Sequence, residues 1–490
     1  MTNISPASRA AQWNSIHGDM RNSDLVSAPL ATHYEVVSRV LEGAAVLFGP
    51  AVDASGNLYL CSGRGPGYSH LHSFDASGTL RWECPVADDG SDALGARVCP
   101  FAPLLTDDGG VVVADERAFF CYESDGALRW RRPLAPLGIY AGFPSAVLSP
   151  RGFLGGVSLE GVVLLLDPET GEPAYTPLKL PVGEAPQAIA APPGIWSGMM
   201  DTSVAQTMFP AFFGTGFPVT NSPAVSEKTG LIYITGAAQE SGKTQLFGIR
   251  EDAGALSLEL NISFDGFCSV TPSVSADGAT VYTGNHTGLI FAFDSQTGAL
   301  RWQYAPAATA ASPTIGPDGT VYSGNTVSPK DNSRLSAVDP ESGLARWCKN
   351  YDELAAELLP ERPVLEGFFP DPQPHASINS VQTVGESLLL VVLTLGYTFA
   401  PPGRGPMTQP HRSVLASIST HSGDLMGYTS LPDSSEAAVV VAADGTVYTP
   451  HAALTSSVFS TLNKHLPAAY QTPLAPVGGV TVLKPMVKRT

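Results

Sequence analysis

Residues 291–306 read FAFDSQTGALRWQYAP. The apolar start predicts a strand that ends at Asp294, then a turn, then a second strand that carries Trp302. In the turn, Asp294 and Thr297 can hydrogen-bond to nearby backbone amides, and Gly298 can adopt the positive φ that other residues avoid. We expect the second strand to be the outermost strand of its sheet, where the Trp302 ring can pack against a neighbouring sheet.

The same turn recurs along most of the chain. Four of the six intervals between successive turn glycines are 44 to 48 residues long, and the other two are 83 and 80 residues long. A repeat of this length is typical of the blades of a β-propeller, and the two long intervals indicate insertions. The glycines of the seven turns are Gly78, Gly126, Gly171, Gly254, Gly298, Gly343 and Gly423.

A second repeated feature is a hairpin in which a small residue, often followed by proline, precedes an apolar pair, a turn and another apolar strand. It occurs eight times, as GPAVDASGNLYL, APLLTDDGGVVV, PSAVLSPRGFLGG, NSPAVSEKTGLIYI, TPSVSADGATVY, SPTIGPDGTVY, INSVQTVGESLLL and AAVVVAADGTVY. Eight hairpins and seven turns leave one unit without its last strand, which residues 33–41 (HYEVVSRVL) can supply. We therefore predict an all-β, eight-bladed propeller whose last blade is closed by an N-terminal strand. Its expected limits are an N-terminal arm at 1–32, the propeller at 33–465 and a C-terminal tail at 466–490.

The turn resembles the tryptophan-docking repeat, roughly AxDxxTGxxxW, of the PQQ-like (pyrroloquinoline-quinone, quinoprotein alcohol dehydrogenase-like) repeat superfamily. The corresponding tryptophans are Trp82, Trp130, Trp302 and Trp347. The resemblance covers about residues 33–465 and implies the eight-bladed propeller. It does not imply the cofactor, because the superfamily includes non-catalytic propellers such as the bacterial outer-membrane assembly lipoprotein, and the motif is a packing device.

Composition excludes several classes of partner. The chain has 45 acidic and 27 basic residues and a formal charge of −18, which repels nucleic acid and anionic lipid. The longest apolar run, at 388–393, is too short to cross a bilayer, and the N-terminus lacks the apolar segment of an export signal. The six cysteines are scattered, without an adjacent pair or a CxxC motif, so we expect reduced thiols, a cytoplasmic location and no zinc site.

Three insertions are expected on one face of the propeller. Residues 180–220 and 348–377 join consecutive blades, and residues 397–411 connect the second and third strands of blade seven. These connections emerge opposite the tight hairpins, so they predict a lid over one mouth of the channel. The N-terminal stretch WNSIHGDMRNSD enters from the hairpin-bearing face, where we expect it to cap the propeller rather than to bind a ligand.

Polar residues expected at the lidded face provide the candidate site. Imidazoles and carboxylates there could perform acid-base chemistry or hold a metal ion, although no specific metal ligands are identified. His72 lies two residues after His70, but other blades carry mostly apolar residues at its position, so His72 is assigned to the core. The candidate catalytic residues are His286, His375 and His451; the candidate ligand-binding residues are His70, Asp201, Asn285, Arg404 and His411.

Three functions remain open from the sequence. The favoured one is a propeller that binds a small molecule or a protein at its lidded face without PQQ. The second is a cofactor-independent lyase, hydrolase or isomerase that uses the histidines as acid and base. The third is a PQQ-dependent dehydrogenase, as the resemblance implies for part of the superfamily. It is less favoured because such enzymes usually carry an export signal, commonly an adjacent cysteine pair, and Glu, Asn and Asp around a calcium ion, none of which can be placed here.

Overall fold

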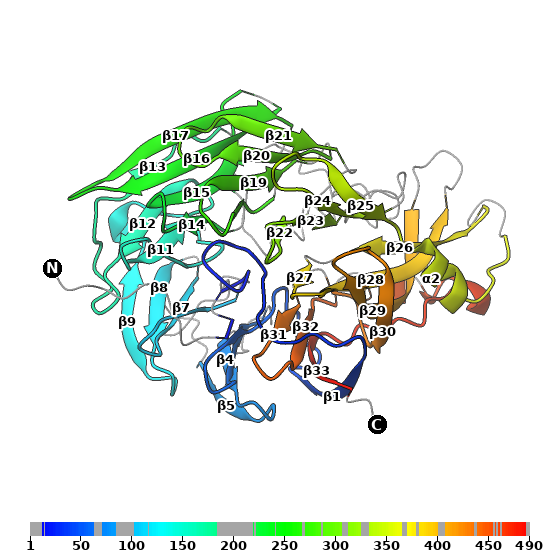
Figure 1. Ribbon diagram of the computed structural model, residues 1–490. Helices are drawn as coiled ribbons and strands as arrows, with labels where there is room; N and C mark the ends of the chain where they lie inside the picture. Colours follow the sequence, from blue (N-terminus) through cyan, green and yellow to red (C-terminus); the bar gives the residue numbers. More distant parts are fainter. Residues whose placement is uncertain are drawn as a thin grey trace.

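The computed structural model describes most of residues 12–486. The exceptions are 14, 63–70, 85–101, 116, 184–218, 220–221, 241, 267–269, 286–287, 306–311, 325–332, 365–369, 379–381, 400–406, 436–438, 454–455, 457–458 and 461–462. Eight antiparallel sheets surround a central axis and form the blades of a propeller (Figure 1). The prediction of an eight-bladed all-β propeller is confirmed.

Blades 1 to 4 each contain four strands in chain order, with the first strand innermost. Blade 1 consists of β2 (Ala51–Val52), β3 (Leu58–Cys61), β4 (Leu71–Phe74) and β5 (Leu80–Glu83). Blade 2 consists of β6 (Leu104–Leu105), β7 (Val111–Ala114), β8 (Ala118–Tyr122) and β9 (Leu128–Pro133). Blade 3 consists of β10 (Val147–Leu148), β11 (Leu154–Val157), β12 (Val162–Leu166) and β13 (Leu178–Lys179). Blade 4 consists of β14 (Ala224–Ser226), β15 (Leu231–Ala237), β16 (Lys243–Glu251) and β17 (Leu256–Asp265).

Blades 5 to 7 follow the same order, except that the inner strand of blade 7 is broken into two pieces. Blade 5 consists of β18 (Ser273–Val274), β19 (Thr280–Gly284), β20 (Ile290–Asp294) and β21 (Leu300–Tyr304). Blade 6 consists of β22 (Thr314–Ile315), β23 (Val321–Gly324), β24 (Leu335–Val338) and β25 (Ala345–Lys349). Blade 7 consists of β26 (Gln373–Ile378), β27 (Thr383–Val384), β28 (Leu388–Phe399), β29 (Met407–Ser419) and β30 (Leu425–Leu431).

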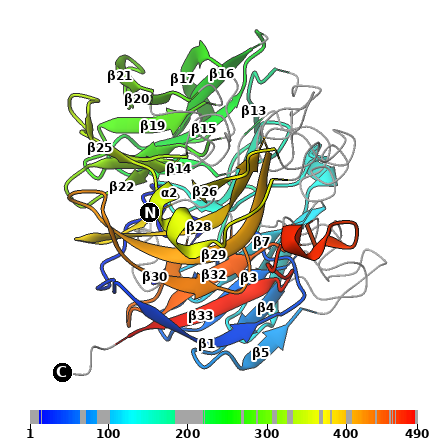
Figure 2. The ribbon, with the colours of Figure 1, turned by 90° about the vertical axis from the view of Figure 1, so that its right-hand side faces the viewer.

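Blade 8 joins the two ends of the chain. Its strands are β31 (Val440–Val441), β32 (Val447–His451), β33 (Gly479–Pro485) and, outermost, β1 (Tyr34–Val40). β1 runs antiparallel to β33, with Tyr34 opposite Pro485 and Val40 opposite Val480, and Figure 2 shows the two strands side by side. The N-terminal strand therefore closes the last blade, as predicted. The strands extend past residue 465, where the sequence analysis ended the propeller, because β33 supplies the third strand of this blade.

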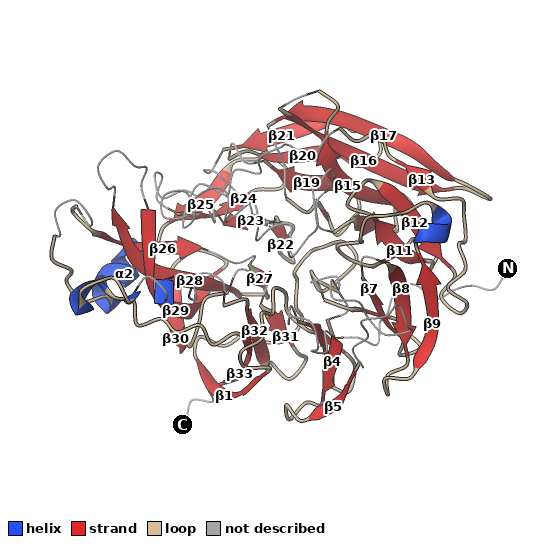
Figure 3. Ribbon diagram, turned by 180° about the vertical axis from the view of Figure 1, so that it is seen from behind, coloured by secondary structure: helices blue, strands red, loops and turns tan. Residues whose placement is uncertain are grey.

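Helical segments are few among the described residues and lie outside the blades (Figure 3). They are α2 (Asp352–Leu358) and two short 3₁₀ helices, η1 (Ala135–Leu137) and η2 (Ala468–Tyr470). In the part of the chain that the structure describes, no helix is long and apolar enough to span a membrane.

Blade 7 reaches farther from the body than the other blades. β28 and β29 contain 12 and 13 residues, and the start of β26 pairs with the end of β28, with Gln373 opposite Thr398. α2 lies beside this extension (Figure 2). Much of the expected insertions at 348–377 and 397–411 therefore has regular structure, because the apolar run of β28 continues into Tyr397 and Phe399, which remain buried.

Four tryptophans fasten their own blades to the next: blade 1 to 2, 2 to 3, 5 to 6 and 6 to 7. The indole Nε1–H of Trp302 donates to the carbonyl oxygen of Pro340 in the next blade at 2.8 Å. The ring also covers Gly343, where an added Cβ would lie 2.7 Å from Cγ of Trp302. Gly343 has a φ of 68°, so glycine is required here both by backbone conformation and by the neighbouring ring. Trp82, Trp130 and Trp347 make equivalent contacts with Ser124 and Gly126, Pro168 and Gly171, and Thr420 and Gly423.

The turn chemistry expected from the sequence is present. The Asp294 carboxylate accepts hydrogen bonds from the backbone N–H and the hydroxyl of Thr297, each at 2.9 Å, and Gly298 has a φ of 71°. Arg301 also donates to Asp294 at 2.8 Å, and this hydrogen bond lowers the pKa of the carboxyl well below its usual range. The adjacent strands β20 and β21 therefore carry both the turn and the docking tryptophan.

The docking contact predicts a defined loss of stability. Replacing Trp302 by Ala should lower the free energy of unfolding by about 3–5 kcal/mol, the usual effect of truncating a buried aromatic side chain. Gly343→Ala should also destabilise, because its methyl group would meet the ring. Chemical denaturation of both single variants and the double variant tests this: the two losses should be less than additive, since removing the ring makes room for the methyl group.

Gly138 provides a matched control for this prediction. Its φ is 72°, but nothing lies within 4 Å of an added Cβ at this position. Gly138→Ala should therefore lose only about 1–2 kcal/mol for the left-handed backbone conformation. Equal losses for Gly138→Ala and Gly343→Ala would contradict the proposed effect of the ring.

Closure of blade 8 can be tested by truncation. Deleting residues 1–42 should expose the edge of β33 and cause association through that edge, which light scattering after gel filtration would detect. Deleting only residues 1–26 keeps β1, so this shorter truncation should show no association through the edge of β33. A 1–42 deletion that stays monomeric with an unchanged melting temperature would refute the role of β1.

Candidate functional site

Residues 12–13 and 15–26, which we call the axial segment, lie on the propeller axis (Figure 1, dark blue). Inner strands of five blades donate backbone N–H groups to its carbonyl oxygens. The bonds are Val52 to Trp13 at 2.7 Å, Val225 to Met20 at 2.6 Å, Val274 to Arg21 at 2.9 Å, Ile315 to Ser23 at 2.9 Å and Val384 to Asp24 at 2.9 Å. The segment therefore binds the free edges of strands that are far apart in the sequence.

These contacts explain the proline of the repeated hairpin. Along a strand, every second residue directs its backbone N–H and C=O groups to the same edge. The residue two positions before each hydrogen-bonded inner-strand residue therefore also directs its backbone groups toward the axis. In four of the five blades that residue is proline, which has no N–H group to leave unpaired. The four prolines are Pro50, Pro223, Pro272 and Pro313.

The axial segment lies at the hairpin-bearing end of the channel. Each bonded inner-strand residue stands at or next to the turn that leads into the second strand of its blade. For example, Val52 is followed by a turn in which Asp53 N–H donates to Asn57 O at 3.0 Å. The contacts agree with the expectation that this stretch caps the propeller from that face.

Side chains within the axial segment hold its shape. The Asp19 carboxylate accepts from the backbone N–H groups of Arg21 and Ser23, each at 3.0 Å, and from the Ser23 hydroxyl at 2.8 Å. Asn22 Nδ2 donates to the carbonyl oxygens of Pro223 and Pro272, which belong to two neighbouring blades. Asn22 and Asp24 have φ values of 56° and 53°, a left-handed conformation that packing must maintain.

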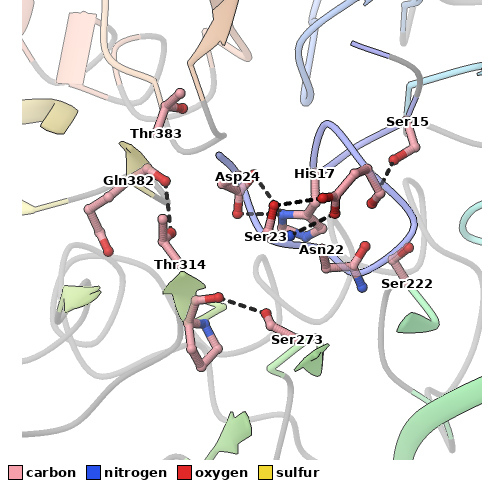
Figure 4. Close-up of polar contacts among 12 residues, drawn as sticks. Ser15, His17, Asn22, Ser23, Asp24, Ser222, Ser273, Thr314, Gln382 and Thr383 are labelled. Atoms are coloured by element: carbon pink, nitrogen blue, oxygen red, sulfur yellow. Dashed lines mark hydrogen bonds and ion pairs between the residues drawn. The ribbon is translucent and has the colours of Figure 1, made fainter. Parts of the chain in front are cut away.

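A buried histidine–aspartate pair lies at the centre of the axial segment (Figure 4). His17 Nδ1 is 3.1 and 3.0 Å from the two carboxylate oxygens of Asp24, and both residues are buried. Burial raises the pKa of Asp24 to about 6, although the contact with His17 opposes that shift. The sequence showed the concentration of polar residues here but could not show which of them pair.

Four of the eight candidate residues lie outside the described residues. They are His70, Asp201, His286 and Arg404.

His375 forms the clearest polar pair among the remaining candidates. It lies on β26 with Nδ1 3.0 Å from a carboxylate oxygen of Asp352, at the start of α2. The same oxygen accepts the backbone N–H of Ala376 at 2.9 Å. Burial acts to raise the pKa of Asp352, but the hydrogen bonds from His375 and Ala376 prevail and lower it. The carboxylate thus fixes the imidazole on the extension of blade 7.

His451 is held inside its own blade, whereas Asn285 joins blade 5 to blade 4, because its Nδ2 donates to Asp265 O at 2.7 Å. His451 is fully buried on β32, with Nδ1 2.9 Å from Ser434 O and Nε2 2.8 Å from Thr481 Oγ1, and burial lowers its pKa. Asn285 accepts the N–H of Leu289 at 3.0 Å across a turn. These contacts give both residues a structural role in the described structure.

His411 lies on β29, with its ring edge toward Tyr397 at 5.6 Å between centroids. Burial, followed by the positive charges of Arg362 and Arg412, lowers its pKa to about 4. His375 and His411 therefore share the extension of blade 7, whereas Asn285 and His451 belong to blades 5 and 8. Because they are spread over three blades, these four candidates do not form one cluster.

His72 is fully buried, as expected from its position in the repeat. Its Nε2 is 3.2 Å from Ser62 Oγ, and its Nδ1 is 3.3 Å from a carboxylate oxygen of Glu83.

Within the described ranges, no group of three His, Cys, Asp or Glu side chains could hold a metal ion. The described cysteines Cys61, Cys84, Cys121 and Cys348 form no disulfide with one another.

Ionisation of Asp24 predicts a pH dependence of stability. An acid with a pKa of about 6 when folded, against an ordinary 3.8, binds more protons in the folded state between these values. The free energy of unfolding should therefore fall by about 2 kcal/mol as pH rises from about 4 to about 6, and this contribution should become level above about pH 7. Urea denaturation across pH 4–7 should show the trend in the wild type, and Asp24→Asn should lack it. A constant difference between the two proteins would contradict the assignment.

Comparisons with known proteins agree with the architecture. A family model described as outer membrane protein assembly factor BamB (PQQ_2) matches residues 213–366. The chain is similar to Protein Rv3035 of Mycobacterium tuberculosis (strain ATCC 25618 / H37Rv), with 26% identity over 329 residues, which is 65% of this chain and 72% of the relative.

Two solved structures share the fold over nearly the whole chain. A europium-containing methanol dehydrogenase aligns with a TM-score of 0.58 at 11% identity, covering 96% of this chain and 98% of its own. A quinohemoprotein alcohol dehydrogenase from Comamonas testosteroni aligns with a TM-score of 0.58 at 12% identity, covering 100% of this chain and 83% of its own. At such identities the likeness concerns the fold alone. With its docking tryptophans and eight blades, the chain has the fold of the PQQ-like repeat β-propellers, and residues 213–366 match a family model of that superfamily.

Proposed function

We propose that this propeller binds a small molecule at the channel mouth opposite the axial segment. The observation that carries the proposal is the set of backbone hydrogen bonds by which the axial segment occupies the hairpin-bearing end. A ligand would then enter from the other end, where α2, β26 and the long ends of β28 and β29 gather. Concave sites with a few fixed polar groups are the usual form of small-molecule sites.

His375 is the residue we expect to contact the ligand. Asp352 holds Nδ1 of its ring, which leaves Nε2 to accept a hydrogen bond from a ligand. We also propose that His70, Asp201, His286 and Arg404 contribute to this site. In the alternative form of the proposal, the partner bound at this face is a protein.

A cofactor-independent lyase, hydrolase or isomerase is the second candidate. The His375–Asp352 pair favours it, because a carboxylate that orients an imidazole is the arrangement of many general bases. In such an enzyme His375 would take a proton from the substrate at Nε2, and Asp352 would stabilise the resulting imidazolium.

We also propose that the ligand is not PQQ and that the protein is cytoplasmic. The absence of an adjacent cysteine pair from the sequence supports the first point. The second is supported by thiols kept inert in the core: burial raises the pKa of Cys84 and of Cys121 to about 12.

Native mass spectrometry can test the proposed site. The purified full-length protein would be incubated with a metabolite extract and measured under native and denaturing conditions. We expect an additional mass that is lost on denaturation and whose occupancy falls at least about tenfold in His375→Gln, as for removal of a key hydrogen bond. His421→Gln is the matched control, because His421 is exposed in a tight turn on the hairpin-bearing face.

Equal occupancy in wild type and His375→Gln would overturn the assignment of this residue. Loss of the ligand in His421→Gln would indicate that the ligand binds at the hairpin-bearing face and not at the opposite mouth. Consumption of the bound compound with release of a new product would favour the enzyme over the binding protein.

A further inference from the structure

The axial segment carries an imidazole nitrogen whose environment points to a ligand. Asp24 contacts Nδ1 of His17, which fixes the proton there and leaves the lone pair on Nε2. His17 Nε2 has no hydrogen bond to another described residue, although the side chain is only 5% exposed. Nε2 is not among the buried side-chain atoms that lack a hydrogen-bond partner, so solvent reaches it, and either a water molecule or a ligand can donate to it.

Buried histidines in this fold differ in how their ring nitrogens are bonded, and His375, like His17, has Nδ1 held by a carboxylate. His451 is also buried, but Ser434 O and Thr481 Oγ1 occupy its two ring nitrogens. His17 has one nitrogen held and one available. In addition, Asn22 and Asp24 on either side of Ser23 keep left-handed backbone conformations, a form of strain that is concentrated at functional sites.

The charges of the axial segment indicate the class of ligand. Arg21 donates to Asp19 at 2.9 Å, and His17 contacts Asp24, so each carboxylate already has a basic partner. The protein as a whole carries a formal charge of −18, which disfavours an anion. The group available to a ligand is therefore the acceptor at Nε2 of His17 (Figure 4).

We propose that His17 forms a ligand-binding site at the inner end of the channel, where Nε2 accepts a hydrogen bond from a hydroxyl group of a small neutral alcohol or polyol. Asp24 is a positioning residue, because it orients the ring without contacting the ligand. The proposal rests on the proposed function in one respect: the ligand reaches this site through the open mouth.

Diethyl pyrocarbonate tests whether Nε2 is reachable. The Nε2 lone pair attacks one carbonyl carbon of the reagent, an N–C bond forms, and the ethyl carbonate group leaves and decomposes to carbon dioxide and ethanol. Peptide mass spectrometry of the full chain should show modification of His17 and of exposed His421, while His451 stays unmodified. Modification of His421 without His17 would overturn the proposal.

Asp24→Asn separates positioning from simple access. Asparagine tolerates a positive φ, so the backbone should be retained. Loss of the carboxylate should slow modification of His17 by about tenfold, the lower end of the effect of removing such a partner, with His421 unchanged as the internal control. An unchanged rate at His17 would show that Asp24 does not position the ring.

Three probes of similar size test the class of ligand: glycerol, glycerate and serinol, which are neutral, anionic and cationic. Glycerol should slow modification of His17 but not of His421. Protection by glycerate or serinol alone, or by none of the three, would overturn the ligand assignment. If His17 is not modified but His375→Gln loses the ligand, only the site at His17 is rejected. If glycerol protects His17 but His375→Gln binds the ligand normally, only the assignment of His375 is rejected.

Discussion

The free edges of the innermost strands impose the main constraint on this propeller. Each blade pairs its inner strand on one side only, so the other row of N–H and C=O groups faces the axis, where an unpaired group is unfavourable. The chain satisfies these groups in two ways. Prolines such as Pro223 and Pro272 remove a donor and offer a carbonyl to Asn22, and the backbone of the axial segment accepts the N–H groups that remain. The segment that seals one end is therefore also the partner that the inner strands require.

A second set of contacts acts between blades at the inner strands. The hydroxyl of Ser273 donates to Pro313 O at 2.6 Å, and that of Thr314 donates to Gln382 O at 2.7 Å. With the tryptophans on the outer strands, each of these blades is joined to the next at both its inner and its outer edge. Such a ring is a rigid scaffold, on which loops at the open mouth can vary without disturbing the fold.

The fold could be predicted from sequence because its signals are local. Asp294, Thr297 and Gly298 form one turn, and Trp302 lies four residues beyond, so a short motif specifies a turn, a strand and a docking surface. The closing strand followed from counting hairpins against turns. The C-terminal limit of the propeller could not be predicted in this way. The segment between β32 and β33 interrupts the blade and hides the relation of residues 479–485 to the repeat.

The candidate site was less predictable because its contacts join distant residues. A histidine before or after a strand looks the same in the sequence whether it faces solvent, as His421 does, or has both ring nitrogens bonded, as His451 does. The pairing of His375 with Asp352 depends on how α2 packs on β26, which no local pattern encodes. Asn22 meets Pro223 and Pro272 only after blades 4 and 5 are in place.

The closure of blade 8 has a consequence for how the protein is made. β1 leaves the ribosome long before its partner β33, because residues 41–478 lie between them. At 5–20 residues per second, the N-terminal strand waits on the order of tens of seconds for its partner. During that time the early blades can form by local pairing, but the ring stays open and β1 exposes both its edges. The propeller can therefore close only after β33 has left the ribosome.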